Sequence, residues 1–196
     1  GKPDMLRTPV PGWDLVARDI PGYTAVSVQT GRGCPFDCSF CDVIYTFGRR
    51  LRLKSIDQVI EEIRLVGKLG ARMIMIADDN FTADRRYVKK LLPRMIELNN
   101  SLDAPIGFIT QLDVTIADDD ELLELLADAN FQEVQIGIES TSADSLRDMN
   151  KPQNAKRDLV EAVRKIQSYG IVVMAHMIVG AESDAAGAFA RAAEFL

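Results

Sequence analysis

Three cysteines lie on one short segment of the chain, and no other position holds one. Cys34, Cys38 and Cys41 have the spacing Cys-x-x-x-Cys-x-x-Cys. Cysteine thiolates hold iron–sulfur clusters, which normally take four such ligands. Three ligands leave one iron open, and in metal sites the open position is where a substrate or cofactor reacts. The spacing therefore predicts a reactive iron–sulfur centre, with these three cysteines as its metal-binding and catalytic residues.

Two other uses of the cysteines fit less well. A structural zinc ion needs a fourth ligand, and the single histidine, His176, is far along the sequence. A disulfide framework is disfavoured because three is an odd number, and because a chain of 196 residues can bury a core without cross-links. A non-catalytic zinc-binding module is the alternative of a different class.

The composition indicates one ordinary globular domain. Hydrophobic residues make up 47% of the 196 residues and charged residues 27%. No apolar run reaches the roughly 18 residues that span a bilayer, and the first residues show no signal peptide. We therefore expect a cytoplasmic protein without a transmembrane segment. The net charge of −6 argues against nucleic acid as a partner, because broad nucleic-acid binding needs a basic surface.

Short apolar runs alternate with segments of helical periodicity. Residues 1–22 contain four prolines and are interpreted as an N-terminal linker or arm, with a core domain over residues 23–196. We expect strands at 23–29, 73–77, 106–110, 134–138 and 171–179. We expect helices at 55–70, 84–98, from 118, from 142, 154–169 and from about 183, with a capping box at Ser55 and Gln58 and a kink or interruption at Pro93. Strand–helix units in series predict an α/β fold with a parallel sheet, whose ligands bind at the carboxyl ends of the strands.

The cysteine segment resembles the signature of the radical S-adenosylmethionine (radical SAM) superfamily. The likeness includes Arg32 and Gly33 before the first cysteine, Phe40 before the last and Asp42 after it. It implies that the three cysteines hold a 4Fe-4S cluster whose open iron binds S-adenosylmethionine. One electron from the cluster then cleaves the sulfonium to a 5′-deoxyadenosyl radical, which takes hydrogen from a substrate carbon.

The resemblance also implies a fold, a partial (β/α)6 TIM-like barrel of parallel strands. This chain supplies about five β/α units of such a barrel. It ends at Leu196, within the helix expected after the fifth strand, and begins with Gly1 instead of methionine. We therefore expect a radical SAM core domain that is truncated at its carboxyl end and lacks the sixth unit.

Further roles implied by the resemblance fall on carboxylates at strand ends. Asp78 and Asp79 follow the second strand and are expected to accept hydrogen bonds from the methionine amino group of S-adenosylmethionine. Which of the two points inward is left open, and so is a helix-capping role. Glu139, with Ser140 beside it, follows the fourth strand and is expected to bind the ribose hydroxyls. The alternative is that Glu139 caps the next helix.

The adenine of S-adenosylmethionine is expected at the end of the fifth strand. The resemblance implies contacts with Ile178 and Gly180 there, and with Phe40 and Val43 on the cysteine segment. Gln111, just past the third strand, is a further candidate for binding S-adenosylmethionine or substrate.

Two features have several interpretations. His176 stands where the family commonly has a small residue, and it is interpreted as a wall residue, a proton donor or a substrate contact. A basic run follows the cysteine segment, at Arg49, Arg50, Arg52 and Lys54. It is either a solvated edge, a clamp for an anionic ligand or a contact to another domain.

Two segments resemble the branch of the family that carries an upstream cobalamin-binding domain. They are Asp78-Asp79-Asn80-Phe81 and Lys151-Pro152-Gln153-Asn154, the second without a role that the residues explain. The branch implies methyl transfer to carbon, cobalamin bound by a domain outside this chain, a small-molecule or lipid-like substrate, and a reductant such as flavodoxin or ferredoxin. A methylthiotransferase acting on transfer RNA is the alternative within the family, and it would need a basic RNA-binding appendage and often a second cluster.

Overall fold

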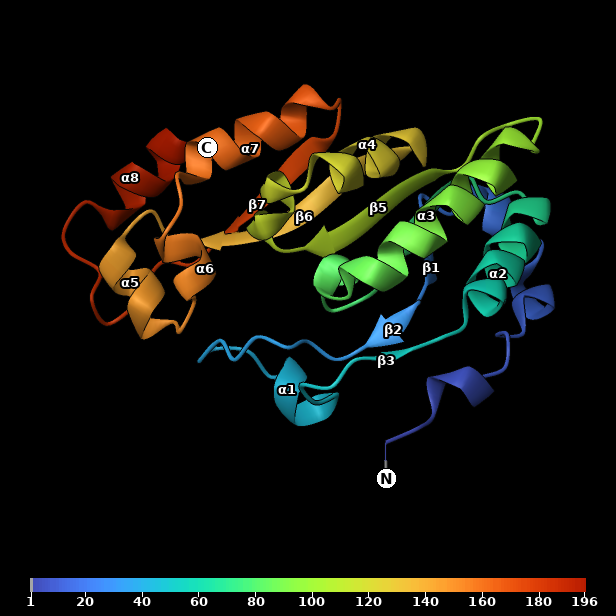
Figure 1. The fold of residues 1–196 in the computed structure, drawn as a ribbon, viewed down its shortest axis with the longest axis horizontal. Coiled ribbons are helices and arrows are strands. Elements are labelled where there is room, and N and C mark those ends of the chain that lie inside the picture. The colour runs from blue at the N-terminus through green and yellow to red at the C-terminus, as the bar shows by residue number, and fades with distance from the viewer. Residues whose placement is uncertain (1) are drawn as a thin grey trace.

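A curved parallel sheet forms the centre of the molecule. The computed structural model describes residues 2–196, and Gly1 lies outside the described residues. Within that range the main sheet has five strands in the order β1-β4-β5-β6-β7, and every neighbouring pair is parallel. The strands are β1 (Val26–Val28), β4 (Met73–Ile76), β5 (Gly107–Leu112), β6 (Phe131–Glu139) and β7 (Val172–Met177) (Figure 1). The predicted α/β fold with parallel strands is confirmed.

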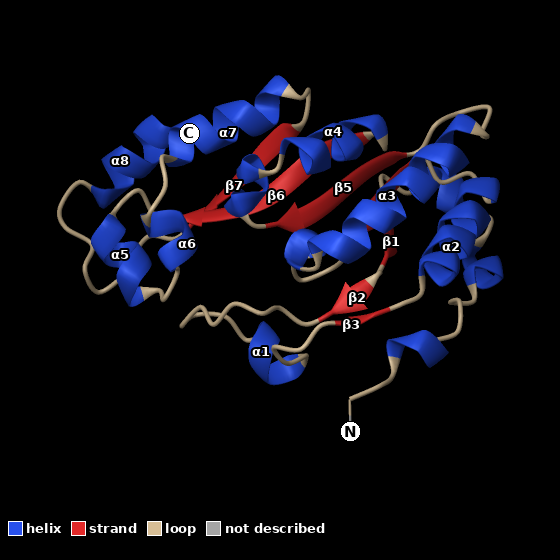
Figure 2. Ribbon diagram, viewed as in Figure 1, coloured by secondary structure: helices blue, strands red, loops and turns tan. Residues whose placement is uncertain are grey.

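The helices connect these strands in sequence order. They are α1 (Val43–Thr46), α2 (Ile56–Lys68), α3 (Arg85–Asn100), α4 (Asp120–Asp128), α5 (Ala143–Asp148), α6 (Pro152–Ala155), α7 (Leu159–Ser168) and α8 (Ala188–Phe195). Short 3-10 helices lie at Met5–Arg7, Trp13–Val16, Ile20–Gly22, Phe81–Ala83 and Val114–Asp118. Figure 2 shows the loops that carry α5 and α6 gathered where the arrowheads of β6 and β7 point. Among residues 2–196, no helix is long and apolar enough to cross a membrane.

The core lies between the sheet and its covering helices. Ile74 and Ile76 of β4 and Val59 and Ile63 of α2 are fully buried. Burying such side chains contributes about 1.5–3 kcal/mol each. The predicted capping box is present at the start of α2, where the Ser55 hydroxyl accepts from the backbone of Gln58 and the Gln58 side chain accepts from the backbone of Ser55.

Four of the expected helices differ from the prediction. Helix α3 continues through Pro93, because this residue is exposed while Leu91 and Leu92 beside it are buried and hold the helix to the core. The carbonyl that loses its partner at a proline can then face water. The helix expected over residues 154–169 is two helices, α6 and α7, and the last helix begins at Ala188 instead of near residue 183. The helix expected from residue 118 begins at Asp120.

A small hairpin, absent from the prediction, brackets the cysteine segment. Strand β2 (Gly31–Arg32) pairs antiparallel with β3 (Arg52–Leu53), so the chain returns to its starting point after the cysteines. The N-terminal arm packs against this region, with Met5 and Ile20 buried. The amide of Gln58 donates to the carbonyl oxygens of Leu6 and Thr8, each at 3.1 Å. The arm is therefore docked on the domain along residues 2–22, while the domain boundary after residue 22 stays a prediction.

Candidate active site

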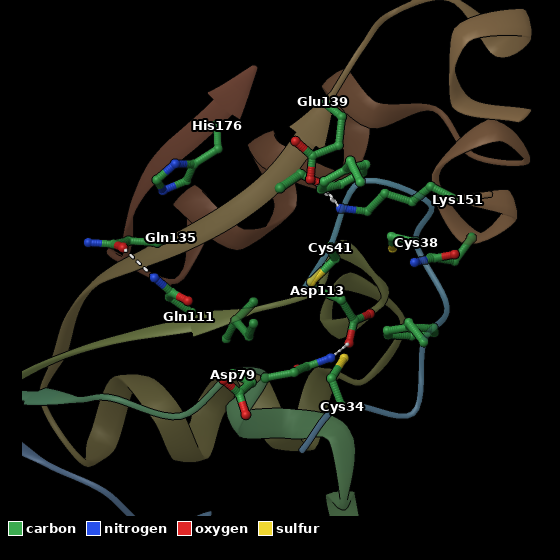
Figure 3. Close-up of a pocket in the computed structure, with 16 residues that line it drawn as sticks. Cys34, Cys38, Cys41, Asp79, Gln111, Asp113, Gln135, Glu139, Lys151 and His176 are labelled. Carbon is green, nitrogen blue, oxygen red and sulfur yellow. Dashed lines mark hydrogen bonds and ion pairs between the residues drawn. The ribbon is translucent and has the colours of Figure 1, made fainter. Parts of the chain in front are cut away.

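A cavity of about 280 Å3 opens at the carboxyl ends of the strands. The cysteine loop forms one side, and the ends of β4, β5, β6 and β7 form the rest (Figure 3). Its polar lining comprises Cys34, Cys38, Cys41, Asp79, Asn80, Gln111, Asp113, Gln135, Glu139, Lys151, Gln153 and His176, and its apolar side chains are Phe36, Phe40 and Leu112. The sequence thus predicted the position of the cavity correctly.

The cysteine loop is fixed at both ends by its backbone. The N–H of Cys34 donates to the carbonyl of Gly48 at 3.3 Å, which closes the loop above the hairpin. Gly33 has φ +105°, and a Cβ there would lie 2.8 Å from the carbonyl oxygens of Gly48 and Arg50. Only glycine suits such a position. The glycine before the first cysteine, which is part of the sequence motif, is therefore required by the backbone.

The middle of the cysteine loop is tied to the segment after α5. The N–H of Ser39 donates to the carbonyl of Met149 at 3.0 Å, and its hydroxyl donates to the carbonyl of Asp148 at 3.0 Å. The amide of Asn150 donates to the carbonyl of Asp37. The cysteines are therefore held against the β6 side of the cavity as well as the β4 side.

The two aspartates after β4 point to different places. Asp78 is buried, and its carboxylate accepts from the N–H of Thr30 at 2.7 Å, from the N–H of Gly31 at 3.1 Å and from the Thr30 hydroxyl. Burial raises the pKa of Asp78 to about 6, against the lowering effect of these hydrogen bonds. Asp78 therefore anchors the start of the cysteine loop and does not line the cavity.

Asp79 lines the cavity and also supports the loop. One carboxylate oxygen accepts from the N–H of Gly33 at 2.8 Å, next to Cys34. Neither aspartate caps the following helix, because Asp84 accepts from the N–H of Tyr87 and caps α3. Of the two, Asp79 is the carboxylate that can reach a ligand in the cavity.

Glu139 lies at the end of β6 and forms a buried ion pair. Its Oε1 is 2.6 Å from the Nζ of Lys151, and both side chains are about nine-tenths buried. Figure 3 shows Lys151 reaching across from the neighbouring loop toward Glu139. Glu139 is not a helix cap, since the Ser142 hydroxyl caps α5. A carboxylate at this depth is stable because a cation accompanies it.

The wall opposite the cysteines carries uncharged polar side chains. Gln111 of β5 and Gln135 of β6 are register partners, and the Gln111 amide donates to Gln135 at 3.3 Å. Figure 3 shows both side chains and His176 of β7 on the same side of the cavity. His176 therefore lies on the cavity wall, which all three of its interpretations require.

Gln135 and Lys151 are cavity residues that sequence reasoning missed. Gln135, Gly137 and Glu139 alternate on one face of β6, so the period-two pattern of a strand could have indicated Gln135. No comparable signal exists for Lys151, because its partner Glu139 is twelve residues away. Asp113 was also missed, and it accepts from the amide of Asn80 at 3.0 Å, joining the ends of β4 and β5.

The residues expected around adenine and ribose are not all brought together. Phe40 lines the main cavity and is 47% exposed. Ser140 and Ile178 instead line a smaller hollow beside α8, which Glu139 also borders. Gly180 and Val43 line neither. The backbone N–H of Gly180 donates to the carboxylate of Asp184 at 2.8 Å. The adenine and ribose roles stay predictions.

The basic run after the cysteine loop makes internal contacts. Arg49 donates to the carbonyl of Pro35 at 2.9 Å, and Arg52 donates to the carbonyl of Phe47 at 3.0 Å. Lys54 forms a buried ion pair with Glu62 at 2.6 Å. Three of the four cations thus stabilise the loop or the fold, and the interpretation as a clamp for an anionic ligand gains no support.

The cysteines suit a cluster better than a single metal ion. Within residues 2–196 no three cysteine, histidine or carboxylate side chains converge closely enough for one ion. Cys34, Cys38 and Cys41 all line one cavity, and in an iron–sulfur cluster each thiolate binds a different iron. Burial raises the pKa of the Cys34 and Cys38 thiols, so ligation must displace their protons.

Comparisons with known proteins show which family the chain belongs to. A family model described as the radical SAM superfamily matches residues 28–196. An uncharacterised methyltransferase of Synechocystis sp. is 38% identical over 99% of this chain and 36% of its own length. The hopanoid C-2 methylase of Rhodopseudomonas palustris is 34% identical over 92% of this chain and 34% of its own. The cobalamin-dependent radical enzyme OxsB, solved with aqua-cobalamin bound, has a TM-score of 0.82 at 18% identity and covers 100% of this chain and 30% of its own.

These matches differ in what they establish. The chain spans about a third of the length of the curated relatives it matches. The likeness to OxsB establishes the fold, a partial TIM-like barrel. The family model extends from β1 to Leu196 and includes all three cysteines. The chain therefore belongs to the radical SAM superfamily.

Proposed function

We propose that this chain is the radical-generating core of a cobalamin-dependent methylase that acts on a carbon of a small-molecule or lipid-like substrate. The observation that carries the proposal is the single cavity lined by three cysteines, Asp79 and Glu139. The family and the donor set fit a 4Fe-4S cluster on Cys34, Cys38 and Cys41. When bound, this cluster supplies the electron that cleaves S-adenosylmethionine to a 5′-deoxyadenosyl radical.

The side chains around the cysteines have distinct tasks in this proposal. Asp79 accepts hydrogen bonds from the methionine amino group, because it is the cavity-facing carboxylate beside Cys34. Glu139 accepts from the ribose hydroxyls, and Lys151 is its ion-pair partner. Phe36, Phe40 and Leu112 exclude water from the cavity, which protects a reactive intermediate. The wall of Gln111, Gln135 and His176 is available to orient the substrate.

The methyl-transfer part of the proposal rests on the relatives. Two matched proteins are named as a methyltransferase and as a hopanoid C-2 methylase, and OxsB is named as cobalamin-dependent. In the proposal, cobalamin is held by a domain outside this chain, and flavodoxin or ferredoxin supplies the electron. Membership of the enzyme superfamily leaves no support for the non-catalytic zinc module.

Anaerobic reconstitution tests the radical chemistry. Full-length protein loaded with iron and sulfide should bind S-adenosylmethionine and release 5′-deoxyadenosine when reduced with dithionite. Cys38→Ala should lose the cluster signal in electron paramagnetic resonance and all 5′-deoxyadenosine, whereas Thr46→Ala on the exposed side of α1 should keep both. A colourless protein with one tightly bound zinc would contradict the proposal.

The cobalamin dependence needs a separate measurement. S-adenosylmethionine with a deuterated methyl group should transfer that label to an isoprenoid lipid substrate only when the full-length protein is supplied with cobalamin. Label transfer at the same rate without cobalamin would refute the cobalamin dependence and leave the methylase activity and the radical core intact.

A further inference from the structure

The carboxyl end of β6 is irregular where it enters the cavity. The register with β7 shifts between Gly137 and Glu139, and Glu139 has φ +64°. Left-handed backbone at a glutamate is unfavourable and persists only where surrounding contacts determine it. The direction of the Glu139 side chain therefore depends on whatever holds this bulge.

Two side chains from one short helix hold the bulge. Lys151 precedes α6 as its N-cap residue and Asn154 lies within it. The Nζ of Lys151 donates to the carbonyl of Gly137 at 2.8 Å and to Oε1 of Glu139 at 2.6 Å. The Nδ2 of Asn154 donates to the carbonyls of Gly137 at 2.9 Å and Ile138 at 3.1 Å. Three of these four bonds go to the backbone carbonyls of Gly137 and Ile138, and the fourth goes to the Glu139 carboxylate.

The Glu139–Lys151 ion pair is tightly enclosed, which leaves its side chains no room for other conformations. Asn154 is 1% exposed and Lys151 is 8% exposed. A Cβ on residue 137 would overlap Oε1 of Glu139 and lie 2.6 Å from Nζ of Lys151, so the ion pair fills the place of a side chain at Gly137. The backbone of Glu139 is fixed on its other side as well, since its carbonyl accepts from the N–H of Ile178 at 2.7 Å.

We propose that Lys151 and Asn154 are positioning residues that aim the Glu139 carboxylate into the cavity and thereby set its affinity for S-adenosylmethionine. The inference rests on the proposed function, in which Glu139 binds the ribose. It gives the Lys151-Pro152-Gln153-Asn154 segment the role that its residues alone do not explain. In metal sites, removing a side chain that orients a ligand typically costs roughly 10–100-fold in affinity, and we expect an effect of similar size here.

A double-mutant cycle on reconstituted protein tests the role of Lys151. Lys151→Met should raise the Kd for S-adenosylmethionine by roughly 10–100-fold, measured by anaerobic equilibrium dialysis. Glu139→Gln should weaken binding too. In the Glu139→Gln background, Lys151→Met should have little further effect, because Lys151 acts through Glu139. Effects that multiply would mean that Lys151 contacts the ligand directly, and would overturn the proposal.

The remaining variants separate positioning from general damage. Lys151→Arg keeps the cation and should recover most of the affinity, while Asn154→Leu should weaken binding with the Glu139–Lys151 pair intact. Lys156→Met, an exposed lysine at the end of the same helix, is the matched control and should bind normally. Iron content and the electron paramagnetic resonance spectrum should stay unchanged in all of these variants.

Failure of the inference and failure of the proposed function give different results. If cluster-loaded wild-type protein does not bind S-adenosylmethionine, the proposed function is wrong. If wild type binds and Lys151→Met and Asn154→Leu bind equally well, only the positioning role is wrong. Lys151→Met leaves Glu139 without its ion-pair partner and could fail to fold. In that case the double variant Glu139→Gln/Lys151→Met, which has no unpaired charge, is compared with Glu139→Gln alone.

Discussion

The β4 side and the β7 side of the main sheet differ in how firmly they hold the cavity. Strand β4 has Ile74 and Ile76 fully buried, and the carboxylates that follow it bind three backbone N–H groups of the cysteine loop. Strand β7 is an edge strand, with Val172 59% and Met174 45% exposed. The side of the cavity that holds the cysteines is thus built on the core, whereas the side that carries His176 and Gly180 is built on a half-exposed edge strand.

The largest expected difference between the β4 side and the β7 side is in the free energy of unfolding. Ile74→Ala should lower the free energy of unfolding by about 2–5 kcal/mol, because it leaves a cavity at a fully buried core position between the neighbouring strands β1 and β5. Met174→Ala on β7 should cost less than about 1 kcal/mol, since much of its side chain already contacts water. Urea unfolding of both variants measures this contrast. Equal losses would show that β7 is as firmly integrated as β4.

Asp78, on the β4 side, should make the stability of the protein depend on pH. Its pKa is raised from 3.8 to about 6, so between these pH values the folded state keeps a proton that the unfolded state releases. This group's contribution to stability is therefore full below about pH 4 and is lost as pH rises through 6. Asp78→Asn cannot titrate and should not lose stability in this way. The free energy of unfolding of the variant, relative to that of wild type, should therefore rise by roughly 3 kcal/mol between pH 4 and pH 7.

Unfolding midpoints at four pH values between 4 and 7 measure this change. Other carboxylates titrate in both proteins and cancel in the difference. Parallel curves for Asp78→Asn and wild type would show that the buried carboxyl group has an ordinary pKa.

Two glycines with nearly the same backbone angle offer a matched test. Gly33 has φ +105° and Gly180 has φ +108°, but a Cβ at Gly33 meets two carbonyl oxygens, whereas at Gly180 it meets nothing within 4 Å. Gly180→Ala should cost only about 1 kcal/mol of backbone strain. Gly33→Ala should cost more and should also reduce iron incorporation, because the loop must move. Equal iron content in both variants would contradict the crowding at Gly33.

The smallest stability effect is expected at Asp184. Its carboxylate accepts from the N–H groups of Gly180 and Ala181 and from the Ser145 hydroxyl, and so ties the loop after β7 to α5. Asp184→Ala should barely change the unfolding midpoint. If Gly180 contacts adenine as predicted, the same variant should weaken binding of S-adenosylmethionine. Unchanged affinity would remove Gly180 from the binding site.

The contrast between the β4 side and the β7 side also bears on which features the sequence could predict. The strands and the capping box at Ser55 depend on local patterns, and these predictions were correct. The different directions of Asp78 and Asp79 were left open, although Ile74, Ile76 and Asp78 alternate in burial and place Asp78 on the buried face. The Glu139–Lys151 pair forms only when β6 and α6 meet in the fold, so no local pattern specifies it.

The continuous helix at Pro93 and the helix break near residue 156 are two further differences from the expected local pattern. Buried Leu91 and Leu92 hold α3 through its proline. Asp158 caps α7 by accepting from the N–H of Glu161, which ends the apparent single helix. Local propensity was outweighed by packing in the first case and by capping in the second.

The tethers of the cysteine loop also have a consequence for cluster assembly. Backbone ordering costs about 1–2 kcal/mol per residue in conformational entropy. Here Asp78, Gly48, Ser39 and Asn150 hold the backbone of the cysteine loop through hydrogen bonds that do not use the cysteine sulfur atoms. We therefore expect the chain to lose and regain its iron while staying folded, so that oxidative damage to the cluster can be repaired without new synthesis of the protein.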